Sequence, residues 1–201
     1  MAKPSKDHTE LLHDYGIHIP SKTIFLESSV ADDGDEDGVN YTMSMKFLKN
    51  LHLLDAENQT INIVLNTGGG DIIQGMAIYD AIVQAKSWII MTVQGDASSM
   101  GCVILQAADE RVMMPHARLM FHLGTPDASG NNIHEVMNAA TAELKYGERI
   151  DSIIYDKMFA KAEAENRVFS KGKYKDMNFK GKFMDAEEAV QLGLADKIKS
   201  K

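Results

Sequence analysis

Apolar residues recur along this chain with two different spacings, one typical of strands and one typical of helices. Short runs rich in β-branched residues predict strands at Thr23–Glu27, Thr60–Asn66 and Trp88–Gln94, and around Val112 and Leu119. Between them, helical spacing predicts helices at Gly38–Leu54, Asp71–Gln84 and Ser99–Ala108. Strands that alternate with helices indicate an α/β domain with a largely parallel sheet.

The stretch from Asn132 to about Ala164 predicts a helix too long for a compact α/β domain. Asn132 and Glu135 have the spacing of a helix cap, and Gly147 is a point where the helix is expected to break or kink. At 1.5 Å per residue the helix spans roughly 50 Å. It is either a long surface helix packed by its apolar stripe or a projecting element whose stripe meets a partner.

A serine lies at the junction of a predicted strand and a predicted helix. The segment Gly95-Asp96-Ala97-Ser98-Ser99-Met100-Gly101 joins the strand that ends near Gln94 to a helix of small residues. A serine at such an elbow projects its hydroxyl beyond the sheet, beside the free N–H groups of the first helical turn. Taken alone, the pattern is more often that of a small residue at the start of a helix.

Two other segments supply complementary chemistry. Asn66-Thr67-Gly68-Gly69-Gly70 ends a predicted strand, and Asp71 then caps a helix. Glycine lets backbone N–H groups face a ligand without an intervening Cβ. Farther along, the strand within Pro115–His122 ends in a histidine. A glycine turn, a serine and a histidine are the components of an acyl-transfer site.

With these motifs the chain resembles the ClpP-type self-compartmentalising serine peptidases from about Thr23 to Ile198. The matching segments, in family order, are Thr23–Leu26, Leu54–Asn58, Asn66–Gly75, Gly95–Gly101, Pro115–His122, Ala186–Val190 and Gly193–Asp196. The resemblance implies a ClpP/crotonase-like spiral of β-β-α units with a projecting handle at about residues 124–165. It also implies one peptidase domain over 23–201, preceded by a segment, 1–22, that is mobile or lines a pore.

The resemblance assigns roles to four positions. Ser99 is expected to be the nucleophile and His122 the general base, because a serine hydroxyl reacts only when a base removes its proton. The backbone N–H groups of Gly70 and Met100 are expected to form the oxyanion hole, which stabilises the tetrahedral intermediate.

The third member of the expected triad is missing from its place. The family carries an acid two residues before the position of Phe183, where this chain has Gly181. Asp176 is the nearest upstream carboxylate and is our sequence-based prediction for this role, although it requires a local insertion. Asn178 is an alternative, since an amide also orients a histidine. Asp185 is instead expected to cap the next helix through the spacing Asp185–Glu188.

Composition sets limits on partners and location. With 201 residues, a net charge of −8 and a pI near 5.3, the chain is disfavoured as a binder of nucleic acid or anionic membranes. It has one cysteine, Cys102, no apolar run that would span a bilayer and no signal-peptide core, so a cytoplasmic location is expected.

Asp33–Gly38 begins like a calcium loop, but Ser44 stands where the ligand Glu is required, and no metal is predicted.

The function expected from the resemblance is that of a serine endopeptidase subunit that cleaves unfolded proteins or peptides inside stacked rings. Seven-membered rings, hence a tetradecamer, and an AAA+ ATPase unfoldase as partner are implied. No cofactor is expected, because the chain lacks G-x-x-x-x-G-K-[ST] and only the partner would use ATP. The alternatives are a weakly active or non-catalytic ClpP-like subunit of a mixed ring and, from another class, a crotonase-like acyl-CoA enzyme.

Overall fold

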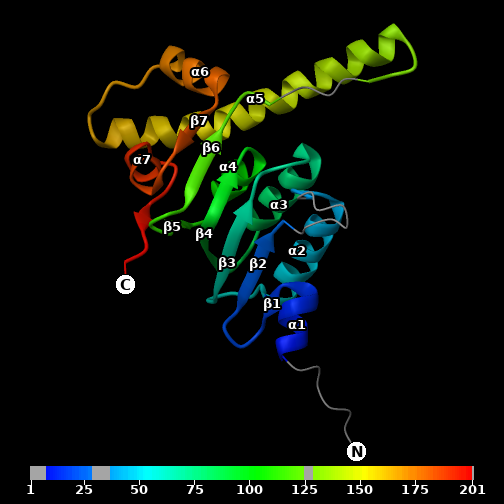
Figure 1. Cartoon of the computed structure of the whole chain (residues 1–201), viewed down its shortest axis with the longest axis vertical. Coiled ribbons are helices and arrows are strands. Elements are labelled where there is room, and N and C mark those ends of the chain that lie inside the picture. The colour runs from blue at the N-terminus through cyan, green and yellow to red at the C-terminus, as the bar shows by residue number, and fades with distance from the viewer. Residues whose placement is uncertain (1–7, 29–36, 125–128, 201) are drawn as a thin grey trace, which may run out of the picture.

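An eight-stranded, mostly parallel sheet lies at the centre of the fold (Figure 1). The computed structural model describes residues 8–28, 37–124 and 129–200. The strands are β1 (Ile17–His18), β2 (Thr23–Glu27), β3 (Thr60–Thr67), β4 (Trp88–Ser98), β5 (Glu110–Met113), β6 (Arg118–Phe121), β7 (Lys182–Met184) and β8 (Lys197–Ile198). The order is β1-β2-β3-β4-β5-β8, and β6 pairs with both β4 and β7. The predicted α/β class is confirmed.

Seven helices accompany this sheet in the described part of the chain. They are α1 (His8–Tyr15), α2 (Tyr41–Leu54), α3 (Ile72–Val83), α4 (Met100–Leu105), α5 (Ile133–Ala164), α6 (Lys171–Lys180) and α7 (Ala186–Gln191). The predicted caps are present: Asp71, Asn132 and Asp185 each accept a hydrogen bond from a first-turn N–H. Four short elements, α1, β1, α6 and β7, were not predicted, because their segments carry no clear apolar period.

Strand β4 is longer than its sequence pattern predicts. It pairs with β5 through Ile90–Val93, continues past Gly95, and then pairs with β6 through Asp96–Ser98. At Gly95 φ is +108°, and a Cβ would lie 2.6 Å from Oδ1 of Asn66. That oxygen accepts the Asp96 N–H at 2.9 Å. Glycine therefore permits the irregular pairing that carries β4 to the site.

The core lies between the sheet and the helices. Alternate residues of β3 and β4 are completely buried, namely Ile61, Ile63, Leu65, Ile89, Met91 and Val93. Cys102 on α4 is buried in the same core, which raises the pKa of its thiol. This agrees with a packing role for the cysteine.

Helix α5 runs without interruption through Gly147, so the expected break there is absent. Its 32 residues give a length of about 48 Å. The residues buried along it, Ile154, Met158 and Ala162, all lie in its C-terminal half. Figure 1 shows the N-terminal half extending beyond the sheet and its other helices. The helix is therefore a projection anchored at one end.

The N-terminal region is packed where the structure describes it. Ile17 is buried and pairs with Ile24 of β2, and Leu11 of α1 packs against the core. The pore-lining role of residues 1–22 stays a prediction, and residues 1–7 lie outside the described part, as does most of the acidic loop at 33–38. Across the described residues, no helix is long and apolar enough to cross a membrane. The cytoplasmic location likewise stays a prediction.

One buried arginine fixes the C-terminal segment to the sheet. The Nη1 of Arg111 donates to Oε1 of Gln106 at 2.7 Å and to the Gly193 carbonyl at 2.9 Å. The backbone N–H and Nε of Arg111 donate to Oδ2 of Asp196 at 2.7 and 3.1 Å. Partial burial by itself raises the pKa of Asp196, but the Arg111 hydrogen bonds and charge outweigh it, so this pKa lies below its usual value.

The pKa of Asp196 predicts a pH dependence of stability. A carboxyl whose pKa is lower in the folded state stabilises fully above its unfolded pKa of about 3.9, and this contribution is lost as pH falls below that value. We expect Asp196→Asn to lower the free energy of unfolding at pH 7 and to weaken its fall below about pH 4. Urea unfolding from pH 7 to pH 3 measures both, with the exposed Asp156→Asn as control. An unchanged acid slope in Asp196→Asn would contradict the assignment.

Candidate active site

Ser99 occupies a strained turn between β4 and α4. Its backbone has φ +52° and ψ −117°, a conformation that costs a non-glycine residue about 1–3 kcal/mol. The Ser99 N–H donates to the Met120 carbonyl at 2.8 Å, and its carbonyl accepts the Cys102 N–H at 3.0 Å. These bonds hold the elbow, so the Ser99 hydroxyl projects beyond the end of the sheet.

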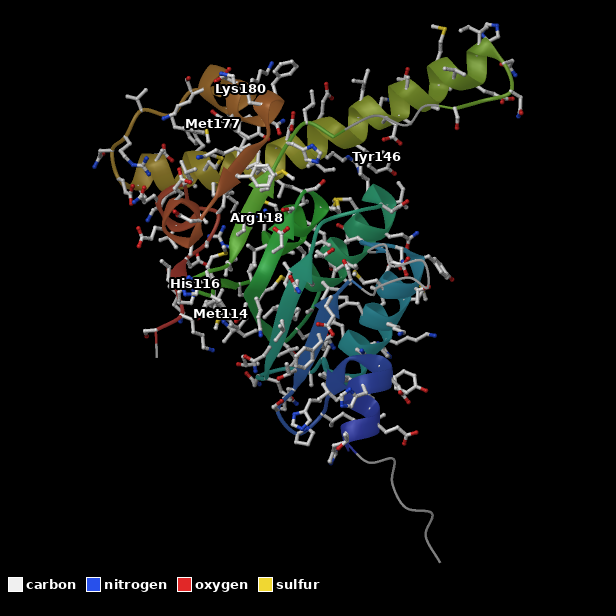
Figure 2. The ribbon with its side chains drawn as sticks, in the orientation of Figure 1. Met114, His116, Arg118, Tyr146, Met177 and Lys180 are labelled. Atoms are coloured by element: carbon white, nitrogen blue, oxygen red, sulfur yellow. The ribbon has the colours of Figure 1, made fainter. Side chains whose placement is uncertain are left out.

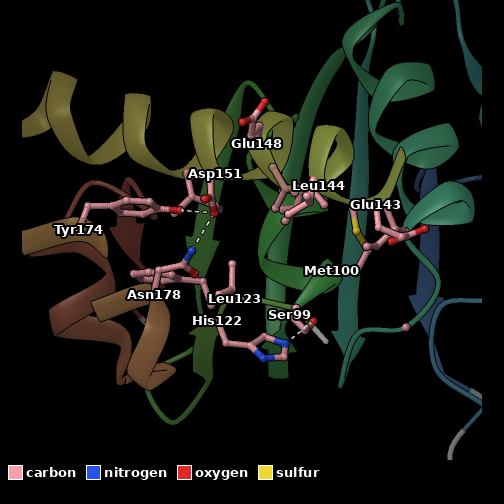
Figure 3. A pocket seen from close by; sticks show the side chains of 18 residues that line it. Ser99, Met100, His122, Leu123, Glu143, Leu144, Glu148, Asp151, Tyr174 and Asn178 are labelled. Carbon is pink, nitrogen blue, oxygen red and sulfur yellow. Dashed lines mark hydrogen bonds between the residues drawn. The ribbon is translucent and has the colours of Figure 1, made fainter. Parts of the chain in front are cut away.

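His122 follows β6 directly, next to the serine elbow. Parallel pairing aligns Asp96, Ala97 and Ser98 of β4 with Arg118, Leu119 and Met120 of β6. Ser99 and His122 consequently leave the same edge of the sheet. Nε2 of His122 lies 2.8 Å from Oγ of Ser99, within hydrogen-bond distance (Figure 3). The structure brings together the two side chains that the motifs singled out.

The neighbouring Ser98 has a different environment. It is 4% exposed, and its hydroxyl donates to Oδ1 of Asp96 at 2.6 Å. Arg118 donates to the other oxygen of Asp96, also at 2.6 Å. Ser98 is therefore committed to a structural hydrogen bond, which agrees with the choice of Ser99 as the nucleophile.

The glycine turn after β3 packs directly against the serine elbow. A Cβ on Gly69 would lie 2.7 Å from the Ser99 Cβ, so only glycine fits there, and φ of Gly69 is +107°. Gly69 and Asp71 are held by hydrogen bonds with Val39, at 2.6 Å and 2.8 Å. Within residues 8–28, 37–124 and 129–200, no hydrogen bond to a protein acceptor is recorded for the Gly70 or Met100 N–H. Two amide donors thus remain available beside Ser99.

The structure does not bring Asp176 to His122. The Asp176 side chain is 61% exposed, and its carboxylate contacts Nζ of Lys180 at 2.7 Å. Figure 2 shows Lys180 on α6, at the outer surface of the molecule. Asp176 and Asn178 both lie on α6, which runs to Lys180, and residues two apart on a helix point in directions about 200° apart. Asn178 therefore faces inward while Asp176 faces solvent.

Gly181 lies where the family acid is expected, beside the histidine. It ends α6 with φ +71°, and a Cβ there would lie 3.7 Å from the His122 Cβ. Among the described residues, the hydrogen bond recorded for the His122 ring is the one to Ser99. Position 181 is therefore adjacent to His122, but as a glycine it supplies no carboxylate to the ring.

Asn178 belongs to a buried network that the sequence analysis missed. The side-chain Nδ2 of Asn178 donates to Oδ1 of Asp151 at 2.7 Å. The backbone carbonyl of Asn178 accepts the Leu123 N–H at 2.8 Å. The Tyr174 hydroxyl donates to the same Asp151 oxygen at 3.1 Å, and burial, with the nearby Asp151, raises the pKa of Tyr174. Asp151 shares a helix face with Ile154 and Met158. A carboxylate on an apolar helical stripe is the sequence signal that would have identified it.

A cavity of about 240 Å³ opens at Ser99. Its walls include apolar side chains of α4, β6 and α5: Val103, Phe121, Leu144, Ile150 and Ile154. Ser99, Met100 and His122 also line it (Figure 3), as does Gly70. Among the described residues, no group of three or more His, Cys, Asp or Glu is arranged to hold a metal ion. The site thus combines a Ser–His pair, available amide donors and a mostly apolar cavity.

Comparison with known proteins agrees with this geometry. A family model described as Clp protease matches residues 21–201. The chain belongs to the Clp protease family. Membership in this family supports a peptidase function for the chain. It gives no support to the alternative of an acyl-CoA enzyme.

Curated relatives of this Clp protease family member share about three residues in ten with it. The ATP-dependent Clp protease proteolytic subunit 3 of Synechococcus sp. (strain CC9605) is 29% identical over 184 residues, which cover 88% of this chain and 82% of the relative. The ATP-dependent Clp protease proteolytic subunit of Deinococcus radiodurans is 31% identical over 164 residues, covering 80% and 76%. The recognition of a ClpP-type chain and of its fold is therefore confirmed.

The contact between Gly69 and Ser99 gives a test of the site's geometry. Gly69→Ala places a methyl group against the elbow, so we expect Ser99 to move and its reaction with a fluorophosphonate probe to slow about 100-fold. Gly172→Ala is the control, because the nearest atom to a Cβ there is Oγ of Ser170 at 3.9 Å. Gel-based labelling rates compare the two variants. Equal rates would show that the glycine does not position Ser99.

Proposed function

We propose that this Clp protease family chain is a serine endopeptidase subunit that cleaves unfolded polypeptides or peptides. The observation that carries the proposal is the 2.8 Å contact between Oγ of Ser99 and Nε2 of His122, both of which line a mostly apolar pocket. The Gly70 and Met100 N–H groups add the electrostatic component that acyl transfer requires.

In the proposed reaction, Oγ of Ser99 attacks the peptide carbonyl carbon while His122 Nε2 takes the hydroxyl proton. The carbonyl oxygen becomes an oxyanion that accepts hydrogen bonds from the Gly70 and Met100 N–H groups. The C–N bond then breaks, and the leaving amine takes the proton from His122. A water molecule attacks the acyl-enzyme in the same way, which releases the acid and restores Ser99.

Among the residues that the structure describes, no carboxylate partners the His122 ring, so the ring would act without one from this part of the chain. In serine proteases, loss of the carboxylate that orients the histidine lowers the rate about 10⁴-fold. Here the Asn178 carbonyl holds the Leu123 N–H and thus the backbone after His122. We propose that catalysis relies on the Ser99–His122 pair, with Asn178 acting on the backbone rather than on the ring.

Gly181 favours a second candidate function. A subunit that builds a chamber with other chains needs the core and α5 but not the acid. In this alternative the chain is a weakly active or non-catalytic member of a mixed ring. The Ser99–His122 contact argues against it, because a purely structural subunit has no need of that geometry.

We further propose that α5 assembles subunits into two stacked rings, of seven members each as the family resemblance implies. Ile133, Met137 and Leu144 on its projecting half are 67%, 61% and 68% exposed. Such apolar side chains on a projecting helix are typical of an interface. An AAA+ ATPase unfoldase is the proposed partner that uses ATP and delivers unfolded substrates.

Active-site labelling tests the proposed function without knowledge of the substrate. We expect a fluorophosphonate probe to label the full-length chain, and Ser99→Ala and His122→Ala to reduce labelling at least about 1000-fold. Asp176→Ala should label at the wild-type rate, because that carboxylate contacts Lys180. A folded wild-type oligomer that fails to label would favour the structural subunit. A slow Asp176→Ala would restore the sequence-based assignment.

A charge on the projecting helix tests the assembly. We expect Met137→Glu to halve the particle mass, because a carboxylate would be buried in the apolar contact between rings. Sedimentation velocity at micromolar concentration measures the mass. Glu163→Lys, near the anchored end of α5, is the control and should leave the assembly intact. A wild-type monomer would overturn the proposal.

A further inference from the structure

The pocket beside Ser99 has an unusual charge for a mostly apolar space. Glu143, Glu148 and Asp151 of α5 all contribute to its lining. No lysine or arginine of the described residues lines it. Among the described lining residues, the other titratable groups are His122 and Tyr174. A cationic side chain that entered would therefore meet carboxylates and no opposing positive charge.

Asp151 is the carboxylate held most firmly in this pocket. Its Oδ1 accepts hydrogen bonds from Tyr174 and Asn178, which fix the orientation of the group. In the part of the chain that the structure describes, no hydrogen bond is recorded for Oδ2, and Asp151 has no ion pair with Lys or Arg. Figure 3 shows the Asp151 carboxylate on the far side of the pocket from the Ser99 hydroxyl.

The position of the pocket indicates which part of a substrate it would receive. The reacting carbonyl carbon must lie at Oγ of Ser99, with its oxygen toward the Gly70 and Met100 N–H groups. Ser99, Gly70 and Met100 all line the cavity. A substrate held in this way would therefore direct into the cavity the side chain of the residue whose carbonyl is attacked. This step rests on the proposed peptidase function.

We propose that Asp151 makes this pocket selective for lysine or arginine on the carbonyl side of the cleaved bond. The aliphatic stem of such a side chain would pack against Leu144, Ile150 and Ile154, and its charged end would reach Oδ2 of Asp151. A leucine or methionine would contact the same apolar walls but would shield the Asp151 carboxylate from water without supplying a positive charge, which costs binding energy. Asp151 is thus a specificity-determining residue at the end of an apolar pocket.

The test uses fluorogenic peptides that are identical except for lysine, arginine, norleucine or leucine at the cleaved position. Norleucine keeps the straight stem of lysine and removes its charge. A hydrogen-bonded ion pair contributes about 1.5–3 kcal/mol, so kcat/KM should be about 10- to 100-fold higher for lysine than for norleucine. A ratio of one or less for lysine over norleucine would overturn the inference.

Substitution of Asp151 distinguishes the effect of its negative charge on substrate selectivity from the effect of its hydrogen bonds on the structure of the pocket. We expect Asp151→Asn, which keeps an oxygen for Tyr174 and Asn178, to reduce the lysine-to-norleucine ratio about tenfold or more. A merely structural role would lower both rates and leave the ratio unchanged, and that result would also overturn the inference. Asp156→Asn, an exposed carboxylate on the same helix outside the pocket, is the matched control and should keep the wild-type ratio.

Fluorophosphonate labelling of the same preparations distinguishes the two levels of the proposal. Labelling with no lysine preference overturns the selectivity of the pocket and leaves the peptidase function standing. An absence of both labelling and hydrolysis in a folded oligomer overturns the peptidase function, and the selectivity with it.

Discussion

The parallel pairing of β4 with β6 is the constraint on which the site depends. β4 leaves β5 after Val93, passes the glycine at 95 and continues beside β6, so two loops far apart in sequence emerge at one edge. One emerging residue is Ser99 and the other is His122, and their 2.8 Å contact follows from this register. A shift of one residue in either strand would turn a reactive side chain to the opposite face.

Close packing on the other side of the elbow makes the geometry rigid. The glycine turn after β3 approaches Ser99 so closely that no side chain fits between them, and Val39 holds this turn in place. Strain at Ser99 is tolerated because the surrounding hydrogen bonds determine its conformation. The same packing leaves the Gly70 and Met100 N–H groups available, so one arrangement supports both the proposed nucleophile and the proposed oxyanion donors.

Helix α5 links the site to the outer parts of the molecule. Its C-terminal half packs on the core, its middle supplies one wall of the pocket, and its N-terminal half projects into solvent with apolar side chains exposed. Asp151 connects this helix to Asn178 on α6, whose carbonyl holds the backbone after His122. A displacement of α5 would therefore change the shape of the pocket and the position of the backbone that follows β6 and carries His122.

The sequence by itself determined the α/β class, the long helix and its cap at Asn132, because apolar periodicity and cap spacing are local properties. It also singled out Ser99 and His122 through the family resemblance of their motifs, but the register of β4 and β6 brings the two side chains together. It did not determine which residue stands behind His122. Asp176 was the nearest carboxylate along the chain, but the rotation of α6 turns it to solvent and turns Asn178 inward. Likewise, only the packing of α5 against α6 brought Asp151 to the pocket, because contacts between residues 27 apart depend on how helices pack and not on local spacing.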